Sequence, residues 1–127
     1  MIAVDTNVLV RFLTRDDPTQ FSRATALFDS EEIWIAKTVL LETEWELRRL
    51  HSFSAAELGA GLRALAGLSN VHFEDEVGVA RAFELWSKGL DFADALHLVS
   101  RGEAEEFATF DNKLVKRAGD SGAVLLK

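Results

Sequence analysis

The sequence predicts an α/β protein in which helices cover a mostly parallel central sheet. Short apolar runs that suit buried strands alternate with longer segments of helical periodicity along the whole chain. The segments between successive predicted strands are long enough for parallel crossover connections. No internal repeat, low-complexity tract or Pro/Gly-rich linker interrupts this alternation, so we expect a single domain over residues 1–127.

The predicted elements of the first half follow from capping residues and apolar periodicity. Asp5-Thr6-Asn7 can cap a helix, Pro18 suits a first helical position, and Ser54 with Glu57 forms a capping box. The elements are a strand at 2–4, a helix after Asp5, a helix from 18 to about 29, a strand at 33–35, a helix from 38 to about 51 and a helix opening at Ser54.

The second half continues the same pattern. Gly89 is placed to end one helix and Asp91 to open the next. The elements are a strand at 71–73, a helix from about 75 to 88, a helix from Asp91 through Arg101, a strand at 106–110, a helix at 112–118 and a strand at 123–126.

Composition bounds the possible functions. With 127 residues, 48% of them apolar and 28% charged, the chain falls in the globular range. The absence of cysteine excludes disulfides, thiolate metal sites and a cysteine nucleophile, so any metal must be held by oxygen or imidazole. The N-terminus lacks a secretion signal and no run is long enough to span a membrane, so we expect a cytoplasmic protein with no membrane partner.

The net charge of −7, from 21 acidic and 14 basic residues, argues against a protein that coats nucleic acid generally. This argument weakens if several acids are gathered in one pocket and neutralised by divalent cations, which leaves basic residues elsewhere to meet phosphates. Lys113, Lys116 and Arg117 form one basic stretch and Arg48-Arg49 another. Each stretch is either a solvated face or an approach to a phosphate backbone.

Four carboxylates stand where a parallel sheet presents its ligand-binding edge. Ligands bind beyond the carboxyl ends of the strands in such sheets. Asp5 ends the first predicted strand, and Asp111 ends the fourth. Glu42 lies one turn into the helix that follows the second predicted strand, and Asp94 lies one turn into the helix that begins near Asp91. We therefore expect Asp5, Glu42, Asp94 and Asp111 to converge.

The surroundings of Asp94 favour a metal site. Its neighbours are apolar, which predicts a largely buried helix, and unpaired or crowded buried carboxylates are costly. Mg²⁺ or Mn²⁺ takes oxygen ligands and would relieve this cost. The matching reaction is phosphodiester hydrolysis by an activated water, with Thr6, Asn7 and Thr109 placed to orient the acids or the water.

Structural roles compete with these assignments. A single Asp after a strand is more often a helix cap than a ligand, and we favour capping for Asp91. Glu44 and Glu46 are interpreted as a solvated face, and the scattered histidines at 51, 72 and 97 lack metal-ligand spacing. The tryptophans at 34, 45 and 86 lie in apolar patterns that are typical of core or interface residues.

Taken together, four segments of the sequence resemble the PIN-domain family, and most of all its bacterial VapC toxin branch. The segments occur in the family's order and span residues 3 to 111: Ala3-Val4-Asp5-Thr6-Asn7, Leu40-Leu41-Glu42-Thr43-Glu44-Trp45, Asp91-Phe92-Ala93-Asp94-Ala95-Leu96-His97 and Ala108-Thr109-Phe110-Asp111. The resemblance implies a three-layer α/β/α sandwich and an Mg²⁺- or Mn²⁺-dependent endoribonuclease.

The resemblance also maps the family's acidic quartet onto Asp5, Glu42, Asp94 and Asp111, which would be the catalytic and metal-binding residues. It implies the toxin component of a type II toxin–antitoxin system, a homodimer, and inhibition by a cognate VapB-type antitoxin. The substrate class is RNA, with transfer RNA and ribosomal RNA as candidates. The fourth acid varies most in the family, so either Asp111 or Asp91 completes the metal shell.

Three other interpretations compete with the nuclease. The first is a PIN-like module that has lost catalysis and only binds RNA or protein. The second is a phosphate-accepting receiver domain, which needs an Asp nucleophile at the end of the third strand, where His72-Phe73-Glu74 stands. The third is an Asp-nucleophile phosphatase, which would want a second Asp at position 7, where Asn7 stands.

Overall fold

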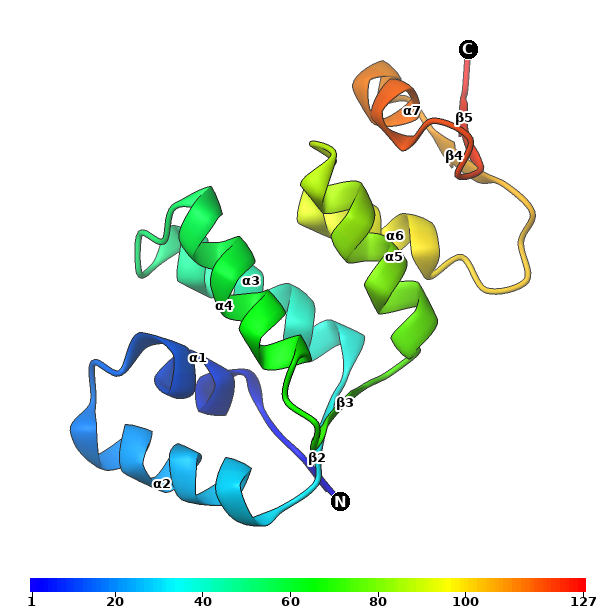
Figure 1. Cartoon of the computed structure of the whole chain (residues 1–127). Helices are drawn as coiled ribbons and strands as arrows, with labels where there is room; N and C mark the ends of the chain where they lie inside the picture. The colour runs from blue at the N-terminus through cyan, green and yellow to red at the C-terminus, as the bar shows by residue number, and fades with distance from the viewer. The chain divides into compact units, whose positions relative to one another are not determined.

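The computed structural model describes residues 1–127, which fall into two compact units, Met1–Glu74 and Asp75–Lys127. Each unit has its own parallel sheet and its own helices (Figure 1). The predicted α/β class with parallel strands is confirmed. None of the seven helices combines the length and apolar character that crossing a membrane requires.

The first unit has a three-stranded parallel sheet in the order β1-β2-β3. Its elements are β1 (Ile2–Ala3), α1 (Thr6–Thr14), α2 (Pro18–Ser30), β2 (Ile33–Ile35), α3 (Lys37–Arg49), α4 (Ala55–Ala66) and β3 (Val71–Phe73). Helix α1 packs against both α2 and α3, and α3 packs against α4 (Figure 1). The core of this unit consists largely of aliphatic side chains that are fully buried, such as Leu9, Ile33, Ile35, Leu40 and Leu62.

Local capping explains where these helices begin. Asp17 caps α2 by accepting a hydrogen bond from the Gln20 backbone N–H at 3.0 Å, with Pro18 in the first turn. The predicted capping box is confirmed, because Ser54 and Glu57 exchange side-chain and backbone hydrogen bonds of 2.9 and 3.1 Å. These contacts span three residues or fewer, which is why the sequence predicts them.

The second unit has a two-stranded parallel sheet. Its elements are α5 (Glu76–Ser87), α6 (Phe92–Val99), β4 (Phe107–Thr109), α7 (Asn112–Ala118) and β5 (Ala123–Leu125). Helices α5 and α6 lie against one another around Phe92, whose ring meets Trp86 edge to face with the centroids 4.9 Å apart. The second unit therefore has an aromatic cluster beneath the helix that bears Asp94.

Helix α6 is shorter than predicted, since it ends at Val99 and not at Arg101. The Arg101 guanidinium donates hydrogen bonds to the carbonyls of Leu98 at 3.1 Å and Ser121 at 3.0 Å. It thereby satisfies a carbonyl of the last turn of α6 and ties that turn to the segment before β5. This long-range hydrogen bonding is not visible in helical periodicity.

Candidate active site

Asp5 occupies the junction between β1 and α1, where it caps the helix. Its Oδ1 accepts a hydrogen bond of 2.7 Å from the Thr6 backbone N–H. No protein group donates to the second carboxylate oxygen, and the residue is exposed. The capping role predicted as the structural alternative is thus real, and it leaves one oxygen of Asp5 for a ligand.

Thr6 and Asn7 do not support Asp5 through their side chains. Thr6 is only 3% exposed, and its hydroxyl oxygen is buried without a hydrogen-bond partner. A buried hydroxyl without a hydrogen-bond partner costs free energy and is uncommon in proteins. Here it belongs to the residue that directly follows the candidate ligand Asp5. The Asn7 side chain lines a groove between α1 and α2 instead of bonding to the Asp5 carboxylate.

Helix α3 carries Glu42 on its exposed side and Glu44 on its buried side. The interpretation of Glu44 as part of a solvated face is wrong: it is 3% exposed, and its Oε2 lies 2.9 Å from the Arg48 Nε atom. A partner one turn away makes burial of this carboxylate tolerable. Conversely Trp45, predicted as a core or interface residue, is 48% exposed and not part of the core.

Geometry explains this distribution on α3. The buried residues Leu40, Thr43, Glu44 and Leu47 are spaced i, i+3, i+4 and i+7, which is one continuous helical face. Position on the helix therefore decides burial in α3, whatever the polarity of the side chain. The Thr43 hydroxyl is satisfied by the Val39 carbonyl at 2.7 Å.

In the second unit, Asp91 and Asp111 both cap helices. Asp91 accepts a hydrogen bond from the Asp94 backbone N–H at 3.2 Å, which confirms its predicted capping role. Asp111 accepts from the Leu114 N–H at 3.1 Å, and its own N–H donates to the Thr109 hydroxyl oxygen at 3.0 Å. Thr109 therefore orients the backbone of the acid that it was predicted to support.

Asp94 is half-buried and lies close enough to other charges to be perturbed by them. Burial raises its pKa, the negative charges of Asp91 and Asp111 raise it further, and His97 partly opposes them. These groups all belong to the second unit, so the structure brings Asp91, Asp94 and Asp111 into electrostatic contact within that unit. Asp5, which caps α1, and Glu42, on α3, belong to the first unit, where α1 packs against α3.

This crowding leads to a prediction for the metal-free protein. Because the pKa of Asp94 is raised on folding, the folded state is penalised once pH rises through that pKa, and the penalty disappears below the ordinary Asp range. Asp94→Asn is therefore expected to raise the melting temperature at neutral pH in the presence of chelator. The gain should shrink as the pH approaches 4, which thermal melts across about pH 4–8 can measure.

An exposed acid provides the control for this measurement. Glu103→Gln removes one negative charge at an exposed position and should leave the melting temperature nearly unchanged over the same pH range. If Asp94→Asn lowers the melting temperature at neutral pH, the like-charge crowding assigned to this site is wrong.

The side chains of the candidate site fit a hard divalent cation in their chemistry. Asp5, Glu42, Asp94 and Asp111 offer only carboxylate oxygens, and the chain has no thiol. No three His, Cys, Asp or Glu side chains form a ready metal-binding group in the structure. Mg²⁺ is compatible with a smaller set, because one or two carboxylates with water and substrate phosphate usually hold it.

The basic residues singled out in the sequence have divergent roles. Arg48 is occupied by Glu44, and Arg117 donates to the Gly89 carbonyl at 3.3 Å. Lys113 and Lys116 are exposed on α7. Arg11 and Arg23 were not among the predicted site residues, although Arg11 follows Asn7 by four residues and so shares its helix face.

The elements define a small α/β protein in which Asp5 and Asp111 follow parallel strands and Asp94 lies in the first turn of a helix. A PIN domain model matches residues 2–120, and the chain therefore belongs to the PIN domain family. PIN domains are typically metal-dependent nucleases that bind RNA. No curated protein matches the chain. The match spans parts of both compact units, and the single-domain assignment stays a prediction.

Proposed function

We propose that this chain is an Mg²⁺- or Mn²⁺-dependent endoribonuclease with Asp5, Glu42, Asp94 and Asp111 as its metal-binding acids. The observation that carries the proposal is the half-buried position of Asp94, whose pKa is raised by burial and then by the charges of Asp91 and Asp111. Neighbouring carboxylates of which one has a raised pKa are more typical of functional sites than of surfaces without a function. A divalent cation would stabilise their ionised forms, and membership of a nuclease family gives that cation a use.

The side chains of this site would act by binding and orienting. The carboxylates of Asp5 and Asp111 each accept one backbone hydrogen bond, from Thr6 and Leu114, which orients them and leaves oxygens for a ligand. When bound, the cation would supply Lewis acidity toward the phosphate and increase the acidity of the attacking water.

Metal dependence provides the direct test. Purified protein freed of any partner is expected to cleave structured RNA in Mg²⁺ or Mn²⁺, to lose cleavage in chelator and to recover it when the metal is restored. The panel should include transfer RNAs and ribosomal RNA fragments, with products resolved on denaturing gels. Undiminished cleavage in chelator would overturn the metal-dependent mechanism.

We further propose that the chain is the toxin of a type II toxin–antitoxin pair, a homodimer held inactive by a cognate VapB-type antitoxin. The resemblance of the Asp5, Glu42, Asp94 and Asp111 segments to the VapC branch supports this role. Induced expression of the chain alone should then arrest bacterial growth. Expression of the Asp94→Asn variant at the same level should not, and equal arrest by both would contradict the toxin proposal.

A binding-only PIN module is the second candidate. It is favoured by the fact that Asp5, Asp91 and Asp111 all serve as helix caps. In that case no RNA would be cut with any divalent metal, while RNA or protein binding would persist. The receiver-domain and phosphatase alternatives gain no support from the family match.

A further inference from the structure

A groove of about 570 Å³ lies between α1 and α2 in the first unit. This volume is within the range of roughly 300–1,000 Å³ that is typical of ligand pockets. Apolar side chains, including Val8 and Leu27, form part of its wall. Its polar lining consists of Asn7, Gln20 and the two arginines Arg11 and Arg23.

The only charged side chains that line the groove are two arginines, one of which, Arg11, is paired with Asp16 outside the lining. Arg11 and Arg23 line it, and no acidic side chain does. Arg23 is exposed and has neither a hydrogen bond nor an ion pair with the protein, so its guanidinium is available to a ligand. An anionic partner is therefore the best match for this surface.

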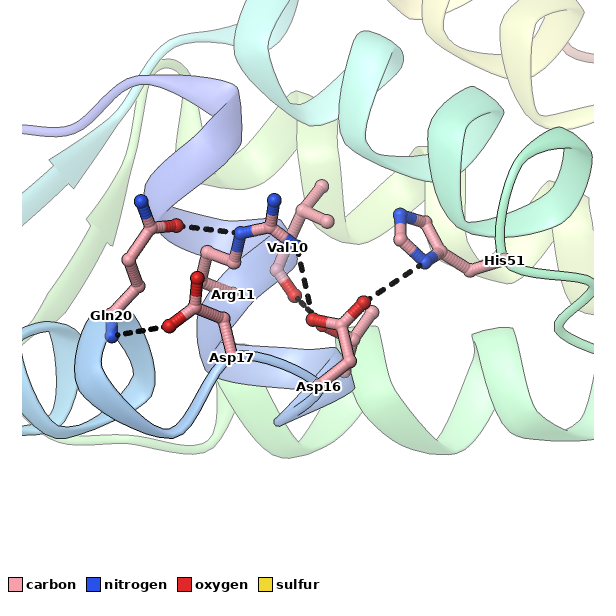
Figure 2. Close-up of polar contacts among 7 residues, drawn as sticks. Val10, Arg11, Asp16, Asp17, Gln20 and His51 are labelled. Atoms are coloured by element: carbon pink, nitrogen blue, oxygen red, sulfur yellow. Dashed lines mark hydrogen bonds and ion pairs between the residues drawn. The ribbon is translucent and has the colours of Figure 1, made fainter.

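Arg11 is held in place by its neighbours, as Figure 2 shows. Its Nε donates to the Gln20 Oε1 atom at 2.7 Å, and its NH1 donates to the Asp16 Oδ1 atom at 2.9 Å. Asp16 also accepts from the Thr14 hydroxyl at 2.8 Å and lies 3.7 Å from the His51 Nδ1 atom. The contacts to Gln20 and Asp16 use two of the five guanidinium N–H donors, so Arg11 is oriented and still has donors to offer.

The lining of the groove starts two residues after the candidate acid Asp5. Asn7 lines the groove and stands in the first turn of α1, the helix that Asp5 caps. Arg11 follows four residues later, about 6 Å along the axis, on the same face. A polyanionic strand that reached Asp5 could continue along α1 over a surface of opposite charge.

We propose that the α1–α2 groove binds the RNA strand beside the cleaved bond, with Arg11 and Arg23 contacting the phosphate backbone. The apolar wall at Val8 and Leu27 would then face a sugar or base. This inference rests on the proposed nuclease function. RNA is favoured over an acidic polypeptide because the groove begins in the first turn of α1, the helix that the candidate catalytic acid Asp5 caps.

RNA binding by Arg23 variants tests this inference. The probe is a fluorescein-labelled single-stranded RNA of mixed sequence, measured by anisotropy in Mg²⁺ with Asp94→Asn as the background to prevent cleavage. Arg23→Gln is expected to weaken binding several-fold and to reduce the slope of log K against log salt by about 0.7, one phosphate contact's share. Arg23→Lys, which keeps the charge, should restore most of the slope.

The control is Arg63→Gln, which removes an exposed arginine from α4, outside the groove. It should leave affinity and slope nearly unchanged. With Asp94 intact, Arg23→Gln should raise the KM for a long RNA and leave kcat near the wild-type value. Thermal melts check that each variant is folded.

The outcomes separate this inference from the proposed function. If the wild type cleaves RNA and Arg23→Gln matches it in affinity, salt slope and KM, the groove assignment is overturned while the nuclease stands. Absence of cleavage with any metal would overturn the proposed nuclease function. The slope of log K against log salt for RNA binding would still decide whether the groove contacts RNA. If Arg23→Gln weakens binding of polyglutamate but not of RNA, the groove is a protein-binding site and the proposal is wrong.

Discussion

Asp5→Asn is expected to reduce RNA cleavage by about 100-fold or more while leaving the fold intact. Loss of residues that merely support a metal ligand commonly costs 10- to 100-fold in activity, so a direct ligand should cost at least about 100-fold. Asparagine caps helices as well as aspartate does, and it can still accept the Thr6 hydrogen bond. The substitution therefore removes the charge of Asp5 and keeps its capping function.

Replacing each of the other acids by its amide distinguishes metal ligands from residues that only cap helices. Asp94→Asn and Glu42→Gln should abolish cleavage to a similar degree, and comparison of Asp111→Asn with Asp91→Asn identifies which of these two completes the metal shell. Single-turnover cleavage rates in saturating Mn²⁺ provide the measurement, with Glu103→Gln as the exposed control. Near-normal rates for both Asp5→Asn and Asp94→Asn would sink the quartet assignment and favour a purely structural role.

Phe92→Ala should destabilise the fold more than any of the charge-removing substitutions. The Phe92 ring is 2% exposed and packs against Phe83, with the centroids 6.0 Å apart, and against Trp86 at 4.9 Å. Replacing a buried phenylalanine by alanine typically costs about 3–5 kcal/mol, because apolar burial is lost and a cavity remains. Urea denaturation, followed by tryptophan fluorescence, measures this change directly.

Val77→Ala is the matched control for Phe92→Ala, since Val77 is an apolar residue of α5 in the same unit but is 84% exposed. Its effect should stay within about 0.5 kcal/mol. Because Phe92 opens the helix that carries Asp94, partial unfolding of Phe92→Ala should also reduce cleavage. A loss below about 1 kcal/mol would mean that the aromatic cluster around α6 is not a core.

The sequence predicted the individual residues of the candidate site more readily than the interactions between them. Asp5, Asp91 and Asp111 were recognisable as residues that follow strands or open helices, and all three do cap helices. The caps form because carboxylates bond to N–H groups within three residues. The pKa of Asp94 is raised first by burial, then by Asp91 three residues away, and then by Asp111, which is distant in sequence, so the local pattern contains only part of the cause.

The sequence by itself determined the order of strands and helices, their parallel α/β class and most of their ends, because these depend on apolar periodicity and hydrogen bonds between near neighbours. Tertiary structure decided which polar side chains are buried and which arginines remain available. Glu44 is buried because it lies on the packed face of α3. Arg101 lies outside α6 and donates a hydrogen bond to the Ser121 carbonyl, which is distant in sequence. Likewise, the groove with Arg11 and Arg23 exists only because α1 packs beside α2.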